Sequence, residues 1–192
     1  MDGKVVYFED FVPENTEATF GLTKARLALG GIEKIVLAST TGATAEKAME
    51  YFSDVGVKLV VIPHQHDFKR KVNAFPPELV EKLGTAGHSV HFGTMLFHTE
   101  GLYGSTAPTV MANLLRCFSQ GVKVCFEIVM MATDAGLLER GESVIAMAGT
   151  GRGADTALVM QAASSQNMPK LRVNEMLCKP LNVYFMEKDQ KD

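Results

Sequence analysis

The sequence predicts a three-layer α/β/α domain with a mostly parallel sheet, and three observations lead to this fold class. Short apolar runs alternate with amphipathic helical stretches, and the links between them are short, which is typical of a parallel sheet with helices on both faces. The runs are compact and rich in β-branched residues, as in strands that are buried on both sides. A seven-residue loop, 149–155, joins two late runs. It is too short for a parallel crossover, so we expect one late antiparallel strand.

The expected strands are apolar runs that end at Gly, Pro or polar residues. They are 4–8, 35–38, 57–62, 89–92, 143–148, 156–161 and 171–177. The expected helices carry apolar residues at helical spacing after a cap or a proline. They are 13–29, which opens with a cap at 13–16, then 45–52, 76–83 and 106–118. Residues 64–75 and 93–105 are expected to be loops.

The stretch 121–138 has two readings. Val122–Phe126 resembles a strand, whereas Ile128–Leu138 resembles a buried helix. We favour a mostly buried helix, because the small residues near its end would allow close packing. Glu127 would then pair with Lys123 one turn earlier. The alternative role for Glu127 is a general base whose pKa is raised by burial.

Composition excludes several classes of protein. The 192 residues carry a net charge of −3 without basic runs, which argues against nucleic-acid binding. No apolar stretch is long enough to cross a membrane, and we expect no secretory signal. Three cysteines without CxxC spacing predict neither a zinc site nor disulfides, and favour the cytoplasm. We expect one domain over residues 1–186 and a flexible tail over 187–192.

The strongest functional signal is the loop Ser39-Thr40-Thr41-Gly42-Ala43-Thr44. A buried strand ends there, turns at a glycine and enters a helix, so the first helical N–H groups face the mouth of the sheet. An anion at such a point gains hydrogen bonds and the favourable end of the helix dipole. We predict a phosphate site here. The competing interpretation is a simple N-cap with a tight turn.

A second signal is the glycine-rich loop Gly149–Thr156. Its three glycines would let the backbone approach a ligand, and Arg152 supplies a positive fork suited to phosphate. The loop matches a dinucleotide-binding fingerprint only in part, and it leads to a strand rather than a helix, which disfavours that site. A hairpin loop with an exposed Arg152 is an equal alternative.

Histidines give a weaker signal. His64 and His66 alternate in a loop after an expected strand end, but spacing supplies no third metal ligand. We therefore expect a solvated loop and no metal, with His64 facing the ligand cleft. His88, His91 and His98 receive no role. Motifs for nucleophilic or hydrolytic catalysis are absent from the sequence.

The order of these motifs resembles the C-terminal domain of pyruvate kinase, and more closely a stand-alone family of that fold, largely of unknown function. The resemblance covers roughly residues 13–162, and its more specific pieces are 13–17 and 151–157. It implies a ligand site that holds a phosphate, with the late loop facing it. It implies Ser39, Thr40, Thr41, Gly42 and Thr44 as the phosphate cradle, with Gly151, Arg152 and Gly153 as the facing wall. We expect the same site to include Asn15, Thr16, Ala43, His64, Gly149, Asp155 and Thr156. The catalytic residues of pyruvate kinase lie in another domain, so kinase activity is not implied.

The resemblance also implies flavin mononucleotide (FMN) as the ligand, and we expect a homo-oligomer. Three functions remain open: an FMN-binding protein that is possibly an oxidoreductase, a non-enzymatic sensor of a sugar phosphate or another phosphorylated metabolite, and a structural assembly module. The last would use the eleven methionines at an interface. We favour FMN binding without efficient catalysis.

Overall fold

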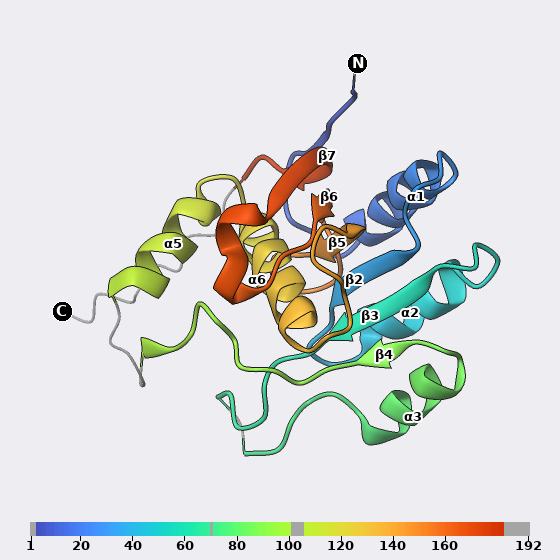
Figure 1. Cartoon of the computed structure of the whole chain (residues 1–192). Helices are drawn as coiled ribbons and strands as arrows, with labels where there is room; N and C mark the ends of the chain where they lie inside the picture. Colours follow the sequence, from blue (N-terminus) through green and yellow to red (C-terminus); the bar gives the residue numbers. More distant parts are fainter. Residues whose placement is uncertain (1–2, 70, 101–105, 183–192) are drawn as a thin grey trace.

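The protein folds as one mixed seven-stranded sheet with helices on both faces (Figure 1). The computed structural model describes residues 3–69, 71–100 and 106–182. The strands are β1 (Val6–Phe8), β2 (Lys34–Ala38), β3 (Lys58–Ile62), β4 (Ser89–Val90), β5 (Ser143–Ala148), β6 (Thr156–Gln161) and β7 (Arg172–Pro180). The helices are α1 (Asn15–Leu27), α2 (Ala43–Tyr51), α3 (Pro77–Thr85), α5 (Thr106–Arg116), α6 (Gln120–Asp134) and the 3₁₀ helix η1 (Ser165–Lys170).

The strand order is β1-β7-β6-β5-β2-β3-β4. Strand β6 runs antiparallel to both of its neighbours, β5 and β7, whereas the other pairs of neighbours are parallel. This confirms the predicted fold class, including the late antiparallel strand. Because β6 alone is reversed, its first residue lies at the same edge of the sheet as the last residues of β5, β2 and β3.

Alternating strand residues divide the core into two layers. Ile35 and Leu37 of β2 pack with α1, α2 and α3, whereas Val36 between them packs with α6. The strands of the centre are therefore apolar on both faces, as their compact apolar sequences predict. The sheet is sandwiched between α1–α3 on one side and α5–α6 on the other (Figure 1).

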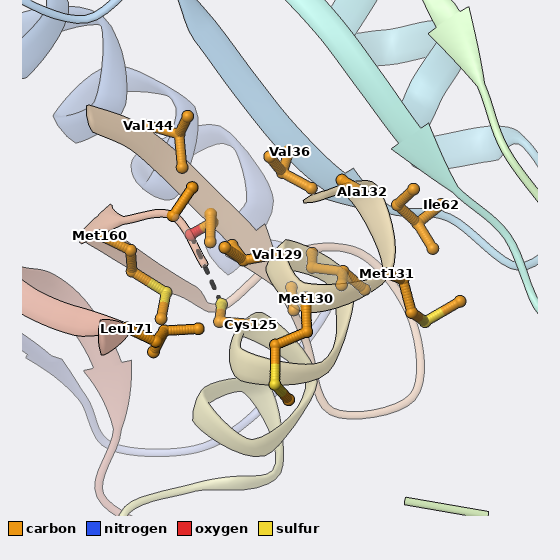
Figure 2. Packing of buried hydrophobic residues seen from close by; sticks show 14 of the residues in the cluster. Val36, Ile62, Cys125, Val129, Met130, Met131, Ala132, Val144, Met160 and Leu171 are labelled. Carbon is orange, nitrogen blue, oxygen red and sulfur yellow. Dashed lines mark hydrogen bonds between the residues drawn. The ribbon is translucent and has the colours of Figure 1, made fainter. Parts of the chain in front are cut away.

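The ambiguous stretch 121–138 is a helix over most of its length, as we favoured. Ser119 caps α6, because its Oγ accepts a hydrogen bond of 3.0 Å from Val122 N. Figure 2 shows the packing of α6, where Cys125 and Val129 face Val36 and Val144 of the sheet. The Cys125 thiol donates to the carbonyl of Ala146, 3.4 Å away. Burial over ten residues of this helix explains why most of its sequence is apolar.

Several predicted boundaries differ from the structure. The first helix ends at Leu27 rather than at Leu29, and Glu14 at its cap makes no side-chain capping bond. The expected strand 89–92 is shortened to β4, whereas 171–177 is lengthened into β7. The predicted tail 187–192 lies outside the described residues. Within the described ranges no helix is both long and apolar enough to span a bilayer.

Candidate functional site

A large cleft opens at the edge of the sheet where β2, β3 and β5 end. Its volume is about 1770 Å³, and its lining includes the segments that follow these three strands, the start of α1, and one face each of α5 and α6. The cleft therefore lies between the two helical layers. Ligands of open α/β sheets commonly bind at this edge.

The loop after β2 forms one wall of the cleft. Thr40, Thr41, Ala43 and Thr44 line it, and so does Ser39, which is 5% exposed. The Ser39 hydroxyl accepts a hydrogen bond of 3.2 Å from Ala45 N, which closes the turn onto α2. The competing interpretation, a simple N-cap with a tight turn, required such a contact. The side chains of Thr40, Thr41 and Thr44 take no part in it and are left for other partners.

Gly42 shapes this loop and does not itself form part of the cleft wall. Its φ is +87°, a left-handed conformation that favours glycine. A Cβ built there would lie 2.5 Å from Leu79 Cδ2 of α3 and 3.1 Å from Pro76 Cδ. Gly42 therefore faces α3, and it does not line the cleft.

The late loop is fastened to the start of α1. Thr16 Oγ1 donates to the carbonyl of Pro13 at 2.6 Å and accepts from Ala154 N at 3.0 Å. A Cβ on Gly153, whose φ is +75°, would collide with the Thr16 hydroxyl. The glycine thus lets the two segments meet. As a result Thr16, Gly149, Gly151, Arg152 and Gly153 all reach the cleft.

Asp155 and Thr156 lie behind the late loop. The Asp155 carboxylate accepts from Thr150 N at 2.8 Å and from Thr156 Oγ1 at 2.7 Å, and it is 2% exposed. Burial raises the pKa of Asp155, against the lowering effect of these hydrogen bonds. Both residues shape the loop without lining the cleft. Asn15 does not line it either, since its amide donates to the carbonyl of Asp10 at 2.7 Å.

His64 lies at the cleft, as expected from its place after β3. Its Nε2 is 3.3 Å from Thr40 Oγ1, so it contacts the loop after β2 directly. Burial lowers the pKa of His64, and the positive charges of neighbouring groups add to this effect. His66 instead packs against Phe92, with ring centroids 4.7 Å apart. Among the residues that the structure describes, no group of three metal-ligating side chains is assembled.

The wall formed by α6 holds a buried ion pair. Lys123 and Glu127 are 0% and 2% exposed, and the ammonium contacts the carboxylate directly, as predicted. Glu127 Oε1 also accepts from Phe97 N at 2.8 Å and lies 3.4 Å from His98 Nδ1. Burial alone would raise the pKa of Glu127, but His98 and Lys123 outweigh it and lower the pKa from 4.5 to about 2. A carboxylate with so low a pKa is a weak proton acceptor, which does not suit the role of a general base.

Sequence reasoning missed His98 and Arg116, which both line the cleft. His98 belongs to the segment after β4, and Arg116 ends α5. His98 reaches the ion pair through tertiary packing, whereas Arg116 bonds to Asn113 and Gln120 close by in sequence, and no local motif marks either residue. The spacing of Gln120, Lys123 and Glu127 along one helical face was the available signal that polar residues gather there.

Comparisons with known proteins found a matching family model and several similar solved structures. The family model for the pyruvate kinase alpha/beta domain matches residues 18–160. Among solved structures, a pyruvate kinase from Cryptosporidium parvum is 17% identical with a TM-score of 0.43, covering 77% of this chain and 23% of that chain. A second structure of that organism's enzyme is 16% identical with a TM-score of 0.41, covering 78% and 22%. A third, in complex with ADP, is 17% identical with a TM-score of 0.43, covering 77% and 24%. The chain spans about a quarter of the length of these enzymes.

Proposed function

The chain belongs to the family of the pyruvate kinase α/β domain, and on this premise we propose that it binds a small phosphorylated molecule in the cleft. The phosphate would be held by residues 39–44, and flavin mononucleotide is the ligand we propose first. The protein would act as a binding module, in a homo-oligomer, rather than as an efficient enzyme.

The start of α2 is the observation that carries this proposal. The N–H groups of Ala43 and Thr44 open the helix, and neither has a hydrogen-bond partner within the described part of the chain. Both residues line the cleft, next to the hydroxyls of Thr40 and Thr41. Unpaired N–H groups at the positive end of a helix dipole are suited to a phosphate group.

The charge of the cleft supports the same ligand class. Four cationic side chains line the cleft without forming an ion pair among the described residues: Lys47, Lys69, Arg116 and Arg152. Glu127 is the acidic residue of the described lining, and Lys123 balances it. The cleft is therefore cationic in a chain whose net charge is −3. Such a field favours an anionic ligand.

The size and lining of the cleft favour a ligand with a ring over a phosphate alone. Apolar side chains form part of the lining, namely Ile62, Phe68, Met95, Ile128 and Met131. Cofactor sites combine such apolar surface with a few polar groups that fix orientation. A sugar phosphate is the second candidate, favoured by the threonine hydroxyls, and it would make the protein a metabolite sensor.

Absorbance of the purified protein and a titration test the proposal together. The protein, freed of any bound small molecule, is titrated with FMN, riboflavin and a sugar bisphosphate. We expect FMN to bind more tightly than riboflavin by at least about tenfold, because only FMN carries the phosphate. Equal affinities would overturn the role of residues 39–44. Tighter binding of the sugar bisphosphate than of FMN would establish the sensor instead.

A further inference from the structure

The α6 wall faces the cleft with a stripe of mixed polar and apolar residues. This stripe follows helical spacing and consists of Gln120, Lys123, Val124, Glu127, Ile128 and Met131. Helix α6 covers the face of the sheet opposite to α2. A molecule whose phosphate lies at the start of α2 would therefore extend its other end toward α6.

His98 is oriented by the ion pair at this wall. Its Nδ1 lies 3.4 Å from Glu127 Oε1 and 3.5 Å from Lys123 Nζ. A ring with its proton on Nδ1 donates to Glu127, and a ring with its proton on Nε2 accepts from Lys123. Nδ1 thus has a partner in either tautomer. No side chain in the described ranges forms a hydrogen bond with Nε2 of His98. His98 lines the cleft, and its side chain is 24% exposed.

Arg116 is oriented at the same wall by neutral groups. Its Nε donates to Gln120 Oε1 at 2.8 Å, and its Nη1 donates to Asn113 Oδ1 at 2.9 Å. Two amides fix the guanidinium without neutralising its charge. Since a guanidinium has five N–H donors, three remain for an oxygen acceptor in the cleft.

Three rings connect this wall with residues 39–44. His64, which contacts Thr40, meets Phe68 edge to face at 5.0 Å, and Phe68 meets His98 in the same manner at 5.2 Å. All three line the cleft. An aromatic ligand placed along them would gain ring contacts that an aliphatic sugar would lack.

We propose that His98 and Arg116 form a second ligand-binding pole of the cleft, which donates hydrogen bonds to carbonyl oxygens on a planar ring at the end of the ligand remote from its phosphate. In this pole His98 carries its proton on Nε2, and its Nδ1 accepts from Lys123. Lys123 and Glu127 are positioning residues that act through His98. This inference rests on the proposed function and narrows the ligand to a phosphorylated molecule with a carbonyl-bearing aromatic ring.

Calorimetry with inorganic phosphate, riboflavin and FMN separates the two poles. His98→Phe keeps the ring contact with Phe68 but removes the donor, and Arg116→Gln removes the charge. Arg140→Gln, at an exposed position outside the cleft, is the matched control. Thr41→Val changes the phosphate loop instead. Thermal unfolding confirms that each variant is folded.

We expect His98→Phe and Arg116→Gln each to weaken FMN and riboflavin binding by about tenfold, the scale of one charge-assisted or buried hydrogen bond. Phosphate binding should be unchanged in both. Thr41→Val should weaken FMN and phosphate but spare riboflavin. Unchanged FMN binding in both wall variants, or an equal loss of phosphate binding, would overturn the second pole. Failure of the wild type to bind FMN and phosphate would overturn the proposed function and the second pole with it.

Discussion

At the scale of single residues, Glu127 shows how a buried charge is kept. The carboxylate accepts hydrogen bonds from Phe97 N and Lys123 Nζ, and its pKa of about 2 lies below the usual 4.5. A carboxyl whose pKa is lower in the folded state than in the unfolded state stabilises the fold above its unfolded pKa. This contribution is lost as pH falls from about 4.5 toward 2.

We therefore predict that Glu127→Gln lowers the free energy of unfolding at pH 7 by about 3–5 kcal/mol, because Lys123 keeps a buried charge without its partner. The difference from the wild type should shrink below pH 4.5, where the wild-type carboxylate begins to lose its advantage. Urea unfolding at pH 7 and pH 3 measures both effects. Glu46→Gln, which breaks the exposed pair with Lys82, should change stability by less than about 1 kcal/mol. A pH-independent difference would contradict the assignment of the low pKa.

Arg152 is the second residue for which the structure gives a clear expectation. It is exposed in the late loop and lines the cleft. We predict that Arg152→Ala weakens the binding of a phosphorylated ligand by roughly 1.5–3 kcal/mol, the scale of a hydrogen bond to a charged group. Calorimetry with FMN tests this, and Arg140→Ala serves as the control outside the cleft. A loss below about 0.5 kcal/mol would mean that Arg152 points to solvent.

At the scale of elements, the turn into α2 depends on packing against α3. The sequence predicted the turn at Gly42 because a strand, a glycine and a helix follow one another. It could not show that the glycine faces Leu79, since α3 begins 35 residues later. The same limit applies to β4, whose length is decided by pairing with β3, and to β7, whose last residues pair with β1. Periodicity located the elements, and their neighbours determined their ends.

We predict that Gly42→Ala destabilises the protein more than Gly56→Ala. Both glycines have positive φ, +87° and +70°, so alanine costs about 1–2 kcal/mol of backbone strain at either position. A Cβ at Gly56 meets nothing within 4 Å, whereas one at Gly42 overlaps Leu79. Overpacking should add about 1–3 kcal/mol at Gly42. Chemical denaturation of the two variants gives the difference in their free energies of unfolding. Equal losses of stability would show that α3 shifts without cost to accommodate the added methyl group.

At the scale of the whole molecule, the cleft was predictable where its residues are adjacent in sequence. The loop after β2 and the late glycine loop, which both line the cleft, were predicted to belong to one site because each is one continuous segment. His98 and Arg116 were not, because His98 meets Lys123 from another element, Arg116 lies at the end of α5, and the neighbours of both residues carry no motif. The pairing of Glu127 with Lys123 was predicted correctly, because the two residues are one helical turn apart. Thus the sequence indicates two loops of the cleft, and the tertiary structure is needed to find His98 and Arg116 in its lining.

We predict that the protein, when loaded with FMN, oxidises NADH or NADPH weakly or not at all. A phosphate anchor binds the ground state and the transition state equally, and therefore does not by itself accelerate a reaction. Stopped-flow absorbance of the flavin under anaerobic conditions measures its reduction. Rapid reduction that disappears in His64→Ala, with FMN still bound, would show that the cleft is an active site.

The lining of the cleft extends from Phe11 to Gly153, with β5 inserted beside β2 only after more than a hundred intervening residues. A nascent chain that has made β2, β3 and α2 therefore has the loop 39–44 without the late loop of the cleft. Contacts this distant in sequence form late in folding, because loop closure must come first. A ligand that needs both loops would find no site on a half-folded chain. Binding of such a ligand would therefore slow unfolding, and it would leave the rate of folding largely unchanged.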